Sequence, residues 1–85
     1  MYKPEFNERW KDWFEPLSPP IKKRIAKKIK QIVEGLPGRN LKHGADFFVE
    51  EIGQYRICYT PDETKKVRRF YFVGDHKEYT KWLRL

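Results

Sequence analysis

Three side chains in the C-terminal part of the sequence, Arg56, His76 and Tyr79, are of types that act on phosphodiesters. A guanidinium is a planar, permanently charged fork that fits a phosphate group, so Arg56 would stabilise a transition state. Histidine titrates close to neutral pH, which makes His76 the candidate acid or base. Tyr79 would donate a proton or stack on a nucleobase. These groups suit metal-free cleavage of RNA, in which the 2′-hydroxyl attacks the adjacent phosphate with help from a base, a cation and an acid.

Each of these side chains also has an ordinary structural interpretation. Arg56 could form an ion pair with Glu50 or Glu51 across a hairpin. His76 follows an aspartate and could belong to a helix cap. Tyr79 could pack in the core with the other apolar residues of the terminal segment. The sequence leaves both interpretations open for all three.

The remaining reactive residues point to no cofactor. No cluster of His, Cys and Asp has the spacing of metal ligands, and no glycine-rich phosphate loop is present. Cys58, the single cysteine, cannot form an internal disulfide and is predicted to be a small buried residue. No apolar run approaches the ~18 residues of a membrane span. We therefore expect a cytoplasmic protein that needs neither metal nor cofactor.

Alternating apolar and polar residues predict three antiparallel strands in the segment that carries the reactive groups. Gly53–Gln54 is typical of a tight reversal between the first two strands, and Pro61–Thr64 of a turn between the second and third. Gly74–Asp75 would break the third strand before a short terminal helix. The predicted strands and helix span 47–52, 55–60, 65–73 and 76–85.

The alternation also assigns side chains to the two faces of this sheet. One face would be apolar and carry Tyr55, Ile57, Tyr59, Phe70 and Phe72. The other would carry Arg56, Cys58, Arg69 and Tyr71. A sheet with one packed and one polar face is suited to binding a ligand.

Two helices are predicted before the sheet. Apolar residues from Phe6 to Leu17 repeat at helical spacing, so a first helix would begin at Pro4 and end at Pro16, after a possible edge strand over residues 1–3. The second helix would begin after Ser18 as N-cap and end at Gly35. The two helices would form an antiparallel hairpin.

This order of elements predicts an α+β fold in one domain spanning residues 1–85. The helical hairpin would pack on one face of a small, mainly antiparallel sheet, with a short C-terminal helix. Arg39 to Gly44 would form a polar connector between the hairpin and the strands.

The chain has a formal net charge of +7, which favours a polyanionic or an acidic protein partner over a merely soluble surface. Six of the nineteen cations lie on the second helix with no intervening acid. They could bind RNA, remain solvated or meet an acidic helix of a partner. The residues expected to contact such a partner are Lys22, Lys23, Lys27 and Lys30.

The order and spacing of several motifs resemble the RelE/ParE toxin superfamily along nearly the whole chain. The strand Tyr55–Tyr59, with its Tyr-Arg-Ile-x-Tyr pattern, is the most telling element. The close of Gly74–Tyr79 is similar to the ending of HigB-type toxins, and Leu41–Lys42–His43 resembles YoeB-type toxins. Together these motifs predict a RelE-like fold.

The resemblance implies the toxin of a type II toxin–antitoxin system, a ribosome-dependent mRNA endonuclease bound and neutralised by an acidic antitoxin in a hetero-oligomer. Arg56 matches the arginine that contacts the scissile phosphate, and His76 and Tyr79 match positions near the C-terminus. RelE carries two lysines on the strand before the Tyr-Arg strand, where this chain has Glu50 and Glu51. The cations expected to contact RNA instead are Arg39, Lys42, Arg69, Lys77 and Lys81.

Two other functions fit the same resemblance. A ParE-type protein would inhibit DNA gyrase by binding it and would need no acid or base, so His76 and Tyr79 favour the nuclease. The missing strand lysines are also compatible with an RNA-binding member that has lost catalysis.

Overall fold

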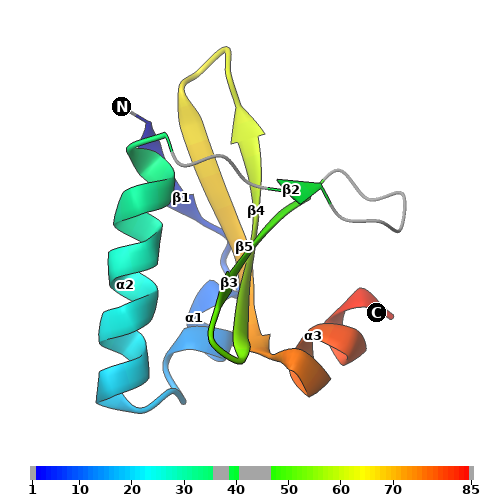
Figure 1. Ribbon diagram of the computed structural model, residues 1–85. Helices are drawn as coiled ribbons and strands as arrows, with labels where there is room; N and C mark the ends of the chain where they lie inside the picture. The colour runs from blue at the N-terminus through cyan, green and yellow to red at the C-terminus, as the bar shows by residue number, and fades with distance from the viewer. Residues whose placement is uncertain (1, 36–38, 41–46, 85) are drawn as a thin grey trace.

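A five-stranded mixed sheet with helices on both faces forms the core of the protein (Figure 1). The structure is a computed structural model and describes residues 2–35, 39–40 and 47–84. The strands follow the order β1-β5-β4-β3-β2, with β1 parallel to β5 and the other neighbours antiparallel. The α+β fold class is therefore confirmed. The elements are β1 (Lys3–Phe6), α1 (Trp10–Phe14), α2 (Pro19–Val33), β2 (Arg39–Asn40), β3 (Phe48–Ile52), β4 (Tyr55–Asp62), β5 (Val67–Asp75) and α3 (His76–Leu83).

The N-terminal segment is a strand where the sequence predicted the start of a helix. Residues 3–6 form β1, which pairs with β5 from Lys3 opposite Val67 to Phe6 opposite Phe70. Phe6 and Trp10 are four residues apart, which looks like helical spacing. Their apolar character instead reflects a shared contact, because both rings pack on Phe70, with centroids 5.5 and 5.9 Å away. The prediction of a helix from Pro4 was wrong because strand pairing across more than sixty residues leaves no local signal.

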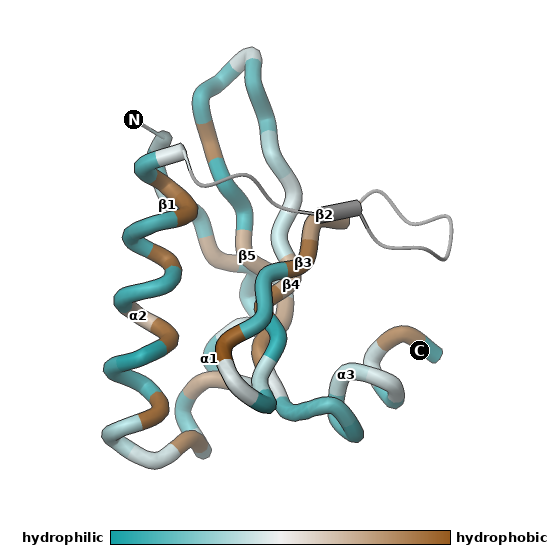
Figure 2. Tube along the Cα trace, viewed as in Figure 1, coloured by the Kyte–Doolittle hydropathy of each residue, from teal (hydrophilic) through white to brown (hydrophobic). Residues whose placement is uncertain are grey.

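The second helix forms as predicted. Ser18 stands at the N-cap position, and Gly35 follows the helix with a φ of +110° that favours glycine. Ile25 and Ile32 are fully buried, and the apolar side of α2 faces the sheet (Figures 1 and 2). Burial of this stripe is what holds the helix, because its opposite side is almost entirely cationic.

The β3–β4 reversal is also confirmed, since Ile52 pairs with Tyr55 across a two-residue turn and Gly53 has a φ of +58°. The following turn lies later than predicted. Pro61 extends β4 because it lies beyond the residues that pair with β3, so its missing N–H interrupts no bond there. Lys65 closes the turn by donating its backbone N–H to Asp62 Oδ1 over 3.0 Å.

The predicted break at Gly74–Asp75 is wrong, because both residues belong to β5 and pair with β4. The predicted connector from Arg39 to Gly44 is partly a strand, because Arg39 and Asn40 form β2 opposite β3. The rest of that connector lies outside the described residues.

A β-bulge overturns the predicted faces of β5. Phe70 lies opposite Tyr59 and Phe72 lies opposite Cys58, so Tyr71 has no partner of its own on β4. The extra residue changes the alternation, so Phe70 and Phe72 reach opposite faces of the sheet. Arg69 and Tyr71 stay together, with the guanidinium 5.8 Å from the ring.

The bulge divides the apolar side chains between two clusters. The α2-side core contains Trp10, Ile25, Ile32, Val33, Ile57, Tyr59, Phe70 and Val73. The α3-side cluster contains Cys58, Phe72 and Tyr79, with Trp13, Val49, Trp82 and Leu83 packed against it. The face opposite α2 carries Arg56, Arg69 and Tyr71 as predicted, and α3 covers part of it.

Phe70 should be the most sensitive aromatic residue of the α2-side core, and Phe6 offers a matched control. Phe70 is 0% exposed and touches three aromatic rings, whereas Phe6, which stacks on Phe70 from outside the core, is 46% exposed. We expect Phe70→Ala to lower the free energy of unfolding by about 3–5 kcal/mol, the usual range for a buried phenylalanine. Phe6→Ala should cost less than half of this in urea unfolding. Equal costs would contradict the assigned core.

Candidate active site

A shallow depression of about 470 Å³ lies where the β3–β4 turn meets the junction of β5 and α3. Strand register brings the β3–β4 turn close to the β5–α3 junction, because Arg56 pairs with Glu51 of β3 on one side and with Gly74 of β5 on the other. The described residues that line the depression are Glu51, Gly53, Gln54, Arg56, Asp75, His76 and Lys77. The structure therefore gathers two of the three predicted catalytic residues in one place.

Arg56 occupies the centre of this arrangement. Its side chain is half-buried, and its guanidinium carbon lies 4.8 Å from the centroid of the Tyr79 ring. Glu51 lies directly opposite on β3, on the same face of the sheet. Arg56 is thus held between a carboxylate-bearing strand and an aromatic ring of α3.

His76 is the first residue of α3 and is exposed at the edge of the depression. The helix begins with a capping box in which Asp75 Oδ1 accepts the backbone N–H of Glu78 over 2.9 Å. Glu78 Oε1 in turn accepts the backbone N–H of Asp75 over 3.0 Å. The capping box is made by these two residues, so the His76 side chain is not used to cap the helix.

Tyr79 lies one helical turn further and is only 8% exposed. Its ring packs 6.2 Å from that of Phe72. Burial raises the pKa of the Tyr79 hydroxyl, Cys58 and Glu51 raise it further, and the Arg56 charge opposes this shift. The Tyr79 ring lies beneath the Arg56 guanidinium. A role for its hydroxyl as proton donor stays a prediction.

The predicted RNA-contacting cations are spread over the molecule. Lys77 lines the depression, and Lys81 is exposed further along α3. Arg39 lies in β2 opposite Val49, and Lys42 lies outside the described residues.

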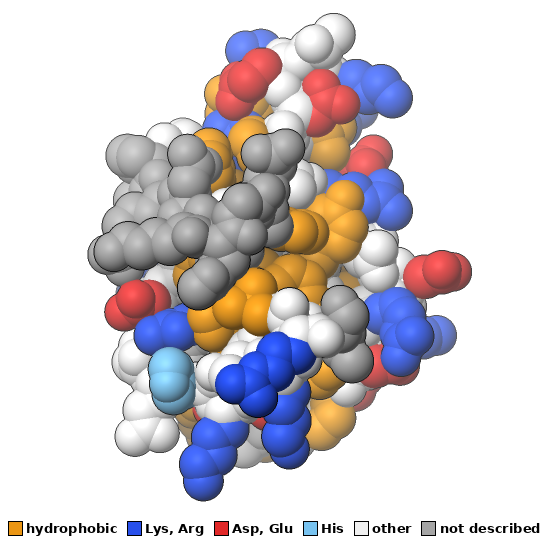
Figure 3. Space-filling model, turned by 90° about the vertical axis from the view of Figure 1, so that its right-hand side faces the viewer, with side chains coloured by type: hydrophobic (Ala, Val, Ile, Leu, Met, Phe, Trp, Pro, Cys, Tyr) orange, Lys and Arg blue, Asp and Glu red, His pale blue; other side chains and the backbone are white. Residues whose placement is uncertain are grey.

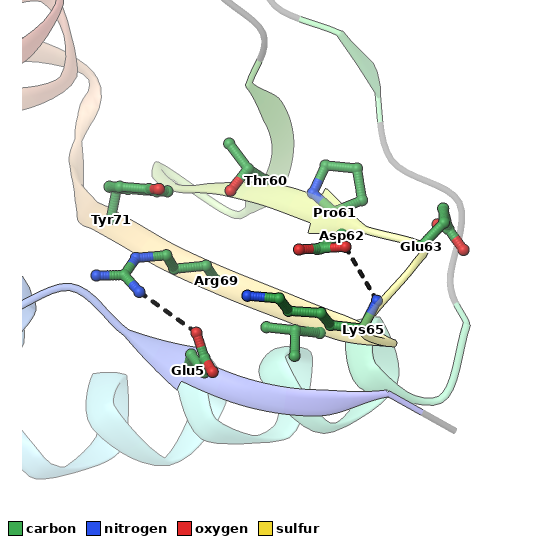
Figure 4. A pocket seen from close by; sticks show the side chains of 9 residues that line it. Glu5, Thr60, Pro61, Asp62, Glu63, Lys65, Arg69 and Tyr71 are labelled. Carbon is green, nitrogen blue, oxygen red and sulfur yellow. Dashed lines mark hydrogen bonds and ion pairs between the residues drawn. The ribbon is translucent and has the colours of Figure 1, made fainter.

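Arg69 lies elsewhere, in a second depression of about 420 Å³ beside the β4–β5 turn (Figure 4). Its Nη1 makes a 3.3 Å ion pair with Glu5 Oε1. The other described residues of this lining are Thr60, Pro61 and Asp62 of β4, Glu63 and Lys65 of the turn, and Val67 and Tyr71 of β5.

The predicted partner-binding lysines lie on α2, which packs on the opposite face of the sheet. Lys22 makes a 3.4 Å ion pair with Glu15, and its Nζ lies 5.7 Å from the centre of the Phe14 ring. Lys23, Lys27 and Lys30 are exposed. They are available to a partner without obstructing the depression.

Two residues near the depression were not predicted as functional. Glu51 was considered only as an ion-pair partner, although the two-residue turn already implies its position opposite Arg56. Arg24 of α2 reaches the turn, where its Nη2 lies 3.0 Å from the position a Cβ on Gly53 would take. No sequence signal marks Arg24, because α2 meets the turn only through the tertiary fold.

Apolar side chains gather beside Lys and Arg side chains on the side of the molecule that carries α3 (Figure 3). On this side the half-buried Phe47 ring packs edge-on against Tyr71 and Trp82 at 5.2 and 5.3 Å. Within the part of the chain that the structure describes, no three His, Cys, Asp or Glu side chains are grouped to hold a metal ion. None of the described helices is long and apolar enough to cross a membrane.

Comparison with known proteins identifies the fold. No protein-family model and no curated protein matches the chain significantly. The RelBE toxin–antitoxin complex of Escherichia coli matches with a TM-score of 0.78 and 22% identity over 88% of this chain and 96% of the matched chain. The isolated RelE toxin of E. coli matches with a TM-score of 0.77 and 20% identity over 99% and 97%. The RelB–RelE antitoxin–toxin complex of Methanococcus jannaschii matches with a TM-score of 0.73 and 17% identity over 92% and 96%.

These structures share an α+β architecture with the chain over most of its length. The chain therefore has the fold of the RelE toxins, which confirms the fold that its motifs predicted.

Cys58 should be inert in the folded protein. It is 0% exposed, and burial raises the pKa of its thiol to about 12, with Arg56 opposing the shift. Roughly one thiol in 10⁴ would then be ionised at pH 8, and the thiolate is the reactive form. We expect a disulfide reagent to label Cys58 far more slowly in native protein than in denaturant.

The raised pKa of the Cys58 thiol also makes the stability of the folded protein depend on pH. Because the folded pKa lies above the ordinary value of 9.0, this thiol leaves stability intact below about pH 9 and reduces it as pH rises towards 12. In the labelling experiment, fast and complete reaction of Cys58 with the disulfide reagent in native protein at pH 8 would contradict its buried position.

Proposed function

We propose that the protein is the toxin of a type II toxin–antitoxin system and cleaves ribosome-bound mRNA without a metal ion. The observation that carries the proposal is the convergence of Arg56, Glu51 and His76 on one depression of a RelE-like fold. A permanent cation and two groups able to exchange protons are what RNA transesterification requires.

Arg56 acts as the clamp on the scissile phosphate. Its guanidinium is half-buried at the depression, so its charge is less screened than that of an exposed arginine. Negative charge develops on the phosphorane oxygens in the transition state, and a fixed bidentate donor stabilises it there. Lys77 at the rim adds a second positive charge near the same phosphate.

Glu51 and His76 exchange the protons. Glu51 takes the proton of the 2′-hydroxyl as the bond from that oxygen to phosphorus forms. His76 in its protonated form gives a proton to the 5′-oxygen as the bond from phosphorus to that oxygen breaks. The products are a 2′,3′-cyclic phosphate and a 5′-hydroxyl, and exchange with water restores both side chains. In this assignment Glu51 acts as the base on the strand where RelE carries two lysines.

The partners follow from charge and from the related structures. A net charge of +7 suits both the ribosome with its mRNA and an acidic antitoxin. RelE of E. coli is seen in a toxin–antitoxin complex, which supports a hetero-oligomer here as well. The exposed cations of α2, Lys23, Lys27 and Lys30, together with Lys22, would contact the antitoxin or ribosome, and Arg39, Lys42 and Lys81 would contact RNA phosphates. The complex would act in the cytoplasm.

Removing the clamp should nearly abolish cleavage. We expect Arg56→Ala to lower the rate of mRNA cleavage on programmed ribosomes in EDTA by about 10²–10³-fold, the usual cost of losing one transition-state donor. Arg9→Ala is the matched control, because Arg9 is exposed and, among the described residues, forms an ion pair with the nearby Asp12 at 3.6 Å.

The same pair of variants can be compared for growth arrest in cells without antitoxin. Arrest that persists in Arg56→Ala would remove this residue from the mechanism. Loss of gyrase supercoiling with intact mRNA would instead indicate a gyrase inhibitor.

The two proton-transfer roles can be separated with a modified RNA. We expect Glu51→Gln and His76→Gln each to slow cleavage by about 10²–10⁴-fold. A substrate with sulfur in place of the 5′-oxygen has a leaving group that needs no acid. That substrate should restore cleavage by His76→Gln but not by Glu51→Gln.

Glu8→Gln, at an exposed position in the segment before α1, controls for the lost charge. Equal rescue of both site variants would contradict the division of roles. Cleavage of an RNA that carries a 2′-deoxy sugar at the cut site would contradict the chemistry itself.

A further inference from the structure

Tyr79 is buried in the α3-side cluster. The capping box at Asp75 and Glu78 fixes the first turn of α3, and Tyr79 follows directly. Its ring packs on Phe72, which also stacks on Trp82 with centroids 5.0 Å apart. Only 8% of Tyr79 is exposed, so its ring has little freedom to move.

The Arg56 guanidinium rests over the face of this ring at 4.8 Å. Ring and cation attract each other, because the face of an aromatic ring is electronegative. A long arginine side chain otherwise explores many rotamers, and ordering it costs conformational entropy. A rigid ring beneath the guanidinium limits that freedom before any substrate arrives.

The same geometry leaves the tyrosine itself away from substrate. Arg56, Glu51 and His76 line the depression, but Tyr79 is absent from the described residues that line it. Burial also raises the pKa of its hydroxyl, which makes that hydroxyl a weaker proton donor. The tyrosine is therefore poorly placed to transfer a proton and well placed to support the arginine.

We propose, on the basis of the proposed nuclease function, that Tyr79 is a positioning residue whose ring holds the Arg56 guanidinium at the depression. Its contribution comes from the aromatic face and not from the hydroxyl. The ring keeps the guanidinium aimed at the phosphate, so the clamp is preorganised for the transition state.

The first test is spectroscopic and requires no nuclease activity. Protons above an aromatic ring are shifted upfield, so the Nε–H signal of Arg56 in a ¹⁵N-arginine spectrum reports the contact directly. We expect this signal to be upfield in wild type and in Tyr79→Phe, and to move downfield in Tyr79→Leu. Arg56→Lys assigns it. An Arg56 signal that does not move in Tyr79→Leu would overturn the proposal.

The second test is kinetic. We expect Tyr79→Phe to retain at least about a third of the wild-type cleavage rate, because the ring is preserved. Tyr79→Leu should lose about 10–100-fold in kcat, the scale expected when a catalytic group is misplaced. Trp82→Leu is the matched control, because Trp82 packs on the same Phe72 ring but not over Arg56. That control should stay near the wild-type rate, and thermal melts of all variants confirm folding.

The outcomes separate this proposal from the nuclease assignment. If wild type fails to cut mRNA, the nuclease assignment fails while the Arg56 signal still reports whether Tyr79 holds the guanidinium. If Tyr79→Phe loses cleavage as severely as Tyr79→Leu with an unmoved Arg56 signal, the hydroxyl is required and the positioning role is wrong. If Trp82→Leu falls as far as Tyr79→Leu, the effect belongs to the cluster and not to the ring beneath Arg56.

Discussion

The pairing of β4 with β5 is the interaction on which the rest of the structure depends. It runs from Tyr55 opposite Asp75 to Asp62 opposite Val67 and contains a single bulge. The bulge lets β5 contribute apolar side chains to both faces of the sheet, so one strand joins the α2-side core to the α3-side cluster. A chain of 85 residues can bury only a limited area of apolar surface. Because β5 contributes to both clusters, apolar side chains on both of its faces are buried.

Gly74 connects this ladder to the candidate active site. A Cβ there would lie 2.7 Å from Cζ of Phe72 and 3.1 Å from the Glu78 side chain. Glycine therefore allows the first turn of α3 to lie close against β5, next to Arg56 on the neighbouring strand. Strand pairing, the capping box and the close approach at Gly74 together place Tyr79 beneath the Arg56 guanidinium and His76 in the same depression as Arg56.

Several of the cations that give the protein its positive net charge form ion pairs within the protein. Arg68 is 8% exposed, with its guanidinium carbon 3.6 Å from the Tyr2 ring centre and an ion pair of 2.9 Å to Glu63. Arg69 and Lys22 also pair with carboxylates. The depression itself mixes cations with carboxylates. Such a mixture supports the proposed transfer of protons at a bound phosphate more than it supports simple anion binding.

The sequence by itself determined the features that arise from neighbouring residues: the limits of α2, the Gly53–Gln54 reversal, α3, and the RelE-like fold through the order of its motifs. Only the tertiary structure decided that residues 3–6 form a strand, that Phe70 and Phe72 face opposite ways, and that Arg56 lies over Tyr79. Capping and turn preferences act over a few residues and can be read locally. Strand partners, bulges and ring contacts join residues far apart in sequence, so packing of the whole chain selects them.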